Sequence, residues 1–173
     1  MQRFAAAACA VLLWALNTVP AASERQRAAI PAVSVEAKMV YLSRDYLEPL
    51  PLSLVEPIIT DAGIKGAEVG LNDNKATGRL LGHSYTLSHV RIARSGELEQ
   101  EVRKTLDPET KLIAADLEPA DLLALAGMPE MQDALIVNLR SSNDDLRGKN
   151  CRRNVFHVAP SWSMRADALA QYL

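Results

Sequence analysis

The sequence contains little cysteine. There are two cysteines in 173 residues, Cys9 and Cys151. Cys9 lies in an uncharged N-terminal segment, so removal of that segment would leave Cys151 as the one thiol. We expect Cys151 to be either a buried small hydrophobic side chain or half of a disulfide whose partner is outside this chain. It is a poor candidate for a nucleophile, because nothing in the sequence supplies a paired base.

An excess of basic residues is also missing. Nineteen lysines and arginines face 21 aspartates and glutamates, which gives a formal net charge of −2. No stretch forms a basic stripe, and proteins that bind nucleic acid neutralise phosphates with clustered Lys and Arg. The composition therefore argues against a nucleic-acid partner.

The common enzyme motifs are absent as well. The glycines of Gly78–Gly82 follow a predicted helix and lack the spacing of a dinucleotide fingerprint, and there is no Walker loop or nucleophile elbow. His83, His89 and His157 are scattered, and no pair has metal-ligand spacing. We expect His89 and His157 to be structural residues within strands. The sequence therefore predicts no catalytic residues, no cofactor and no metal, and a protein that is not an enzyme.

The N-terminus has the layout of a secretory signal peptide. Arg3 precedes an uncharged run, Phe4–Val19, and small residues around Ala21 form a plausible cleavage site. The alternative is an uncleaved anchor, but the run is shorter than the roughly 20 residues that span a bilayer. No twin-arginine pattern is present, which favours the general secretion route. We expect residues 1–21 to be removed after Ala21, and residues 22–173 to be a soluble periplasmic protein.

The rest of the chain alternates between strand and helix patterns. Five strands and five helices in strict alternation predict an α/β fold: a doubly wound, mostly parallel five-stranded sheet with helices on both faces. The predicted strands cover residues 33–41, 84–92, 112–115, 134–139 and 154–159. The predicted helices include residues 63–74, 98–106, 119–127 and 161–173.

The segment Asp61–Gly82 is the most informative part of the pattern. We expect a helix over residues 63–74 with Thr60 or Asp61 as its N-cap. Gly66 and Gly70, four residues apart, would let this helix pack closely on the sheet. Gly78 and Gly82 would then bracket the turn into the next strand.

Polar residues follow several of the predicted strands. In a doubly wound sheet, ligands bind beyond the carboxyl ends of the strands. Arginine, hydroxyls and helix-start amides suit a small anionic or zwitterionic ligand. Alternatively, the serines are caps and turn residues, and Arg140 pairs with Asp144 or Asp145. Asp116 follows the third strand, and the candidate ligand-binding residues at the other strand ends are Ser43, Arg44, Arg140, Ser141, Ser142, Pro160 and Ser161.

Several of these segments resemble one known family. The helix and turn from Ile64 to Gly82 resemble the first helix and turn of type I periplasmic substrate-binding proteins, in particular the leucine/isoleucine/valine-binding class of ABC importers. Ala134-Leu-Ile-Val-Asn138, Ser142-Asn-Asp-Asp-Leu-Arg147 and Val158-Ala-Pro-Ser161 match later strands and their exits, and Met164–Leu173 is similar to the fifth helix. Together they also resemble a subgroup associated with PQQ-dependent alcohol dehydrogenase systems.

The resemblance implies a function and a domain plan. Residues 22–173 would be the N-terminal lobe of a two-lobe binding protein, and we expect a truncated chain because the second lobe is missing and the last helix pattern ends without a cap. A small polar ligand, an amino acid or a carboxylate, would be delivered to an ABC permease in the inner membrane.

Two departures from the family weaken the case for an amino acid. The connection Ser43–Thr60 is unusually long, and the sequence Arg140-Ser141-Ser142 stands where the family has its serine and threonine run. A second hypothesis is therefore an accessory protein whose long connection docks onto a quinoprotein dehydrogenase.

Overall fold

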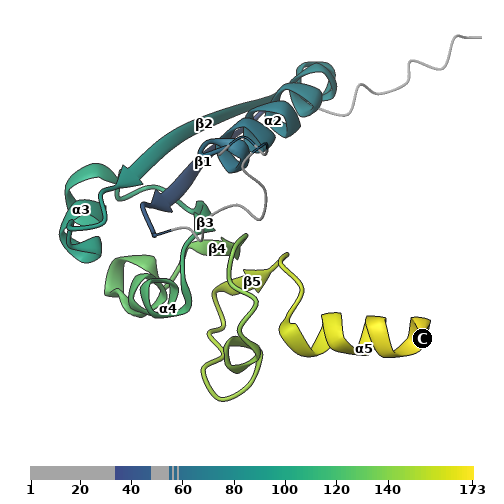
Figure 1. Cartoon of the computed structure of the whole chain (residues 1–173). Coiled ribbons are helices and arrows are strands. Elements are labelled where there is room, and N and C mark those ends of the chain that lie inside the picture. The colour runs from purple at the N-terminus through teal and green to yellow at the C-terminus, as the bar shows by residue number, and fades with distance from the viewer. Residues whose placement is uncertain (1–33, 48–54, 56, 58) are drawn as a thin grey trace, which may run out of the picture. The chain divides into compact units, whose positions relative to one another are not determined.

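The computed structural model describes residues 34–47, 55, 57 and 59–173. The predicted signal peptide and cleavage site, and most of the long connection before Thr60, lie outside these residues. The elements run in the order β1 (Val35–Arg44), α2 (Ala62–Leu81), β2 (His83–Ile92), α3 (Leu98–Thr105), β3 (Leu112–Asp116), α4 (Pro119–Gly127), η1 (Pro129–Met131), β4 (Leu135–Asn138), η2 (Asp144–Arg147), β5 (Val155–His157) and α5 (Trp162–Tyr172) (Figure 1).

The five strands form one sheet in the order β2-β1-β3-β4-β5, and every neighbouring pair is parallel. This confirms the predicted α/β doubly wound fold. The prediction that an α-helix follows every strand is wrong after β4. Residues 139–154, all of them described, contain only the short 3-10 helix η2 between β4 and β5. The first strand is also longer than predicted, so Ser43 and Arg44 are its last two residues and do not follow it.

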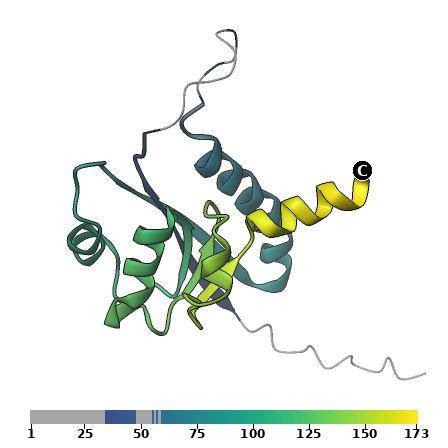
Figure 2. The same ribbon diagram turned by 60° about the horizontal axis from the view of Figure 1, so that its bottom comes forward.

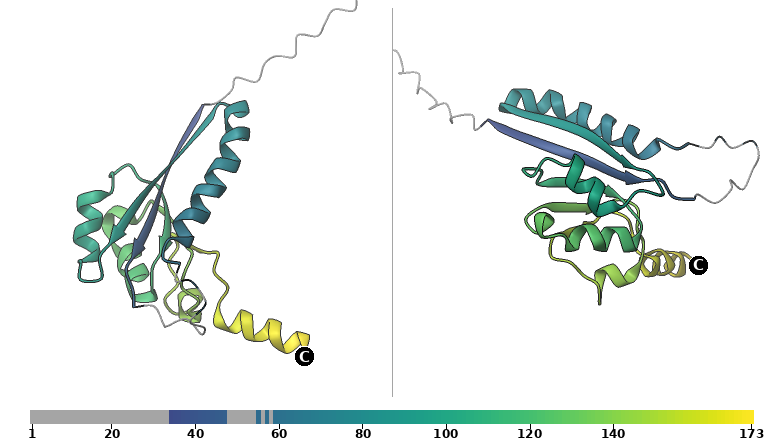
Figure 3. Two further views of the ribbon diagram at one scale, coloured as in Figure 1. Left: turned by 45° about the horizontal axis from the view of Figure 1, so that its top comes forward. Right: turned by 90° about the vertical axis from the view of Figure 1, so that its left-hand side faces the viewer.

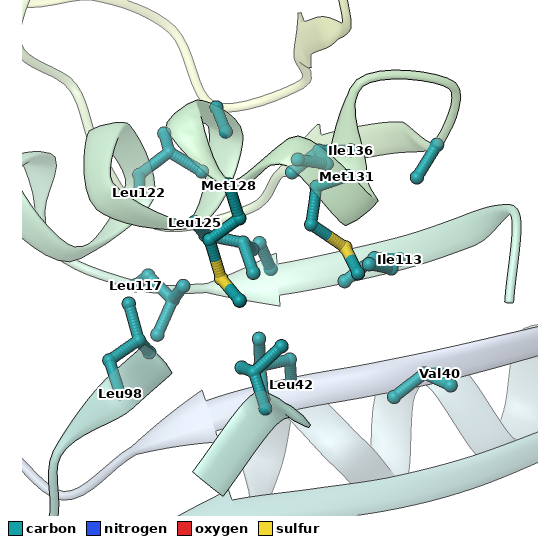
Figure 4. Close-up of a cluster of buried hydrophobic side chains, with 14 of the residues drawn as sticks. Val40, Leu42, Leu98, Ile113, Leu117, Leu122, Leu125, Met128, Met131 and Ile136 are labelled. Atoms are coloured by element: carbon teal, nitrogen blue, oxygen red, sulfur yellow. The ribbon is translucent and has the colours of Figure 1, made fainter. Parts of the chain in front are cut away.

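The main hydrophobic core lies between the sheet and helices α3 and α4 (Figure 4). Alternate residues of a strand point to the same face, so Val40 and Leu42 of β1 share this face with Ile113 of β3 and Ile136 of β4. Val102 of α3 packs against the same cluster. Figure 2 shows the sheet lying between α3 and α4 on one side and α2 on the other.

Helix α2 covers the other face of β1 and β2 and comes close to the sheet at two glycines. A Cβ at Gly63 would overlap the hydroxyl of Tyr41, and a Cβ at Gly78 would overlap the ring of Tyr85. Gly66 and Gly70 are exposed, and an added Cβ at either would meet no described atom within 4 Å. The expectation that Gly66 and Gly70 allow close packing is therefore wrong, and Gly63 and Gly78 have that role.

The predicted end of the first helix at Asn74 is also wrong. Helix α2 continues through Asn72-Asp73-Asn74 to Leu81, and Gly82 terminates it with φ 74°. A left-handed residue after the last helical turn is the usual position for glycine, because glycine has no Cβ to clash there. The amide of Gly82 donates to the Arg79 carbonyl at 3.4 Å, so this glycine caps the helix.

Helix α5 begins where predicted, because the side chain of Ser161 accepts a hydrogen bond from the Met164 amide. None of the residues of α5 is buried, and the helix extends from the end of the sheet in both views of Figure 3. The neighbouring face of β4 and β5 is open in the same way, with Leu135 39% and Phe156 58% exposed. Within the described ranges, no helix has the length and apolar character needed to cross a membrane.

Candidate functional site

The candidate site lies at the carboxyl ends of β1, β3 and β4. The sheet order changes direction between β1 and β3, and ligands of doubly wound sheets bind at such a switch point. Four side chains from distant parts of the sequence meet there: Tyr41, Tyr46, Asp116 and Arg140. We refer to these four residues as the switch-point cluster.

Asp116 is held from one side by Tyr41. The Tyr41 hydroxyl donates to Oδ2 of Asp116 at 2.9 Å, and the start of α2 covers the pair because Gly63 has no side chain. Burial, and then the hydrogen bond to Asp116, raise the pKa of the Tyr41 hydroxyl well above its ordinary value. The phenol therefore stays protonated and remains a donor to the carboxylate across the physiological pH range.

Arg140 faces the same carboxylate from the other side. Its Nη1 lies 3.4 Å from Oδ1 of Asp116, longer than the roughly 2.7–2.9 Å of a tight charge-assisted hydrogen bond. The side chains are 29% and 28% exposed, so both charged groups face solvent in part. The guanidinium also lies over the ring of Tyr46, 4.9 Å from its centroid. Among described residues, no ion pair joins Arg140 to Asp144 or Asp145, in contrast to the alternative considered from the sequence.

Tyr46 is itself fixed by α4. Its hydroxyl donates to Oδ2 of Asp121 at 2.5 Å and accepts from the Glu118 amide at 3.0 Å. Burial, and then the Asp121 hydrogen bond, raise the pKa of Tyr46. A rigid aromatic ring therefore supports the guanidinium of Arg140, and such cation–π contacts contribute about 0.5–2 kcal/mol.

Ser43 and Arg44, two of the predicted ligand residues, have other partners at the end of β1. The Ser43 hydroxyl lies 2.8 Å from Nε2 of His89 on the neighbouring strand. Arg44 points to the opposite face of the sheet, where Nη1 pairs with Asp121 at 2.6 Å and Nη2 donates to the carbonyls of Arg94 and Gly96 at 3.0 Å. Arg44 therefore joins β1 to α4 and to the turn after β2.

The predicted residues after β4 and β5 lie together. Ser141 is bonded through its backbone to the Asn138 side chain, and the Ser142 carbonyl accepts from the Trp162 amide at 3.0 Å. Ser161 caps α5, while Pro160 beside it is exposed. Ser141, Ser142 and Ser161 are buried and connect the strand exits.

Asp144 joins the same connection from η2. It accepts from the hydroxyl and the amide of Ser163 in the first turn of α5. Hydrogen bonds from Ser161 and Ser163 lower the pKa of its carboxyl. The exit of β4 and the start of α5 are therefore bonded to each other both through Ser142 and through Asp144.

Sequence reasoning identified Asp116 and Arg140 but missed the two tyrosines. Tyr41 is the last residue of a predicted strand, and Tyr46 lies in the long connection that follows it. The contacts that give them a role join residues 72 to 75 positions apart. A pattern that could have indicated them is an aromatic residue at or just after the carboxyl end of a central strand.

Two further expectations concern chemistry. Over the described residues, no group of three or more His, Cys, Asp and Glu side chains could hold a metal ion. Cys151 is free and exposed, so the expectation of a buried small hydrophobic side chain is wrong.

No family model matches the chain, and neither the curated proteins nor the solved structures contain a match.

Proposed function

We propose that this chain is a ligand-binding lobe of a periplasmic solute-binding protein of the branched-chain-amino-acid type, which captures a small polar ligand for an ABC importer. The observation that carries the proposal is the loose pair of Asp116 and Arg140 at the switch point of an all-parallel sheet. Both charges are partly exposed, and each is held by a tyrosine.

The pair offers a ligand one donor group and one acceptor group. A ligand carboxylate could replace Asp116 as the partner of Arg140, because a guanidinium binds carboxylates through two parallel N–H groups. A ligand ammonium or hydroxyl could donate to Asp116. Tyr41 and Tyr46 hold the two charges in place before a ligand arrives, which reduces the entropy lost on binding.

The location and the partner are further parts of the proposal. The pattern of Arg3, the uncharged run to Val19 and the small residues at Ala21 supports export to the periplasm. Delivery to an inner-membrane permease follows from the resemblance of Ile64–Gly82 and the later strand exits to importer-binding proteins.

The test is a thermal-shift screen of the full chain against L-leucine, L-glutamate, acetate and ethanol. A compound at 100 times its Kd stabilises a protein by about 2.7 kcal/mol, or roughly 5–10 °C for a domain of this size. We expect Arg140→Ala and Asp116→Asn to remove the shift. Arg103→Ala is the matched control, since Arg103 is a paired arginine on α3. A panel without any shift, or an equal shift in Arg140→Ala, would contradict the proposal.

A further inference from the structure

The exit of β4 is shaped by one buried amide, the side chain of Asn138. Its Oδ1 accepts from the Ser141 amide at 2.8 Å, and its Nδ2 donates to the Ser141 carbonyl at 2.7 Å. These two bonds close the turn that carries Arg140. Nδ2 also lies 3.0 Å from Nδ1 of His157 on β5. Asn138 is fully buried, so water does not replace any of these partners.

The bonds to Ser141 determine the protonation state of His157. A backbone N–H can only donate and a carbonyl can only accept, so Ser141 fixes which end of the Asn138 amide carries the hydrogens. The Nδ2 hydrogen then points at Nδ1 of His157, which must accept. His157 is therefore a neutral imidazole with its proton on Nε2. A proton on Nδ1 would place two N–H donors against each other.

The surroundings of His157 oppose a second proton. Leu122 and Leu123 of α4 line the recess beside the ring together with Asn150 and Arg152, and the recess is too narrow for a water molecule. Burial, and then the charge of Arg147, lower the pKa of His157, and the Leu146 carbonyl acts in the opposite sense. Within the described structure, Nε2 of His157 and Nη1 of Arg147 are both buried without a hydrogen-bond partner.

We propose that Asn138 and His157 are positioning residues that hold Arg140 for ligand binding, and that a proton on Nδ1 of His157 opens the Ser141 turn. The charged imidazole repels the Nδ2 hydrogens, so Asn138 must rotate and lose its two bonds to Ser141. The turn then no longer fixes the residue before it, Arg140, against Asp116 and Tyr46. The effect on a ligand rests on the proposed function, but the opening of the turn does not.

The opening is tested by following assigned amide and side-chain NMR signals of the full chain from pH 8 to pH 4.5. We expect the Ser141 amide, the Arg140 Nε–H and the His157 ring to move with one common midpoint below the ordinary histidine pKa of about 6.5. His157→Gln keeps an acceptor that does not titrate, so the step at Ser141 should vanish. His89→Gln is the matched control and should keep the step.

Titration of the His157 ring without movement of Ser141 would overturn the proposal, and this needs only the wild-type chain. A Ser141 step that persists in His157→Gln would overturn it as well.

Ligand affinity provides a separate readout. If L-leucine or acetate binds, its apparent Kd should rise about tenfold for each pH unit below the midpoint, since only the closed turn binds. His157→Gln should abolish that slope. A slope shared by wild type and His157→Gln would contradict the role of the turn in binding. Failure of every compound to bind would instead contradict the proposed function, and the signals of Ser141 and Arg140 would still decide the proton-driven opening.

Discussion

The two faces of the sheet are built differently. The face under α3 and α4 is filled with apolar side chains such as Ile113, Leu125 and Ile136, all fully buried. The opposite face carries α2 over β1 and β2, leaves Leu135 and Phe156 exposed, and ends in the polar switch-point cluster. One face therefore supplies most of the apolar packing, whereas the partly exposed charges of the proposed ligand site lie at the carboxyl end of the sheet.

The separation is tested most strongly by truncating one large side chain on each face. Leu125→Ala should lower the free energy of unfolding by about 2–5 kcal/mol, because a buried leucine leaves a cavity. Phe156→Ala is the matched change on the open face, where the side chain is 58% exposed. Phe156→Ala should lower the free energy of unfolding, measured in urea, by less than about 1 kcal/mol. Equal losses would show that both faces are packed in solution.

Arg44 and Arg140 should differ in how much each contributes to the free energy of unfolding. Arg44 has three hydrogen bonds, and the side chains of Arg44 and Asp121 are 21% and 18% exposed. Arg44→Ala should therefore cost about 1.5–3 kcal/mol. Arg140→Ala should cost less than about 1 kcal/mol, because its pair with Asp116 is longer and more exposed. A larger loss in Arg140→Ala, measured by the same denaturation, would reverse the assignment of structural and ligand-facing roles.

The glycines of α2 give a third comparison. Gly63→Ala should destabilise the protein by about 1–3 kcal/mol, because the new methyl group pushes the Tyr41 ring off Asp116. Gly66→Ala, on the exposed side of the helix, should stabilise by up to about 1 kcal/mol through helix propensity. Melting temperatures of the two variants measure the contrast, and a similar shift in both would mean that α2 does not contact Tyr41.

The smallest expected effect concerns Tyr41. Tyr41→Phe should cost about 0.5–1.5 kcal/mol at neutral pH, the contribution of one hydrogen bond. Folding raises the pKa of this phenol. The Tyr41 hydroxyl therefore contributes its full stabilisation below the pKa of an unfolded tyrosine, about 10, and this contribution declines as the pH rises above that value. Wild type should therefore lose more stability than Tyr41→Phe between pH 9 and pH 11. Parallel losses in denaturation at the two pH values would contradict the raised pKa.

Local signals predicted most of the fold. Helix α4 was predicted with its correct bounds because Pro119 suits the first turn of a helix and Gly127 its end. The end of α2 was missed because Asn72-Asp73-Asn74 has low helix propensity, and contact of Gly78 with Tyr85 outweighs that preference. A local sequence pattern does not predict tertiary contacts of this kind.

The site was predicted only in part for the same reason. Strand ends indicated Arg140 and Asp116 because parallel strands bring their carboxyl ends to one edge. Which polar residue faces solvent there depends on partners far away in sequence. Arg44, also at a strand end, instead pairs with Asp121 and donates to the carbonyls of Arg94 and Gly96 on the opposite face of the sheet. The sequence allows Ser161 to be either a helix cap or a ligand-binding residue, and in the structure it caps α5.

The exposure of helix α5 affects how the protein melts. None of its 11 residues is buried, so its order depends on the Ser161 cap, the bonds of its first turn to Ser142 and Asp144, its internal hydrogen bonds and the stacking of Arg165 on Trp162 at 5.0 Å. Helices of this length are marginal in water without packing. We therefore expect α5 to follow a helix–coil equilibrium separate from the cooperative melting of the sheet. On warming, ellipticity should fall gradually as α5 frays, well before the core unfolds.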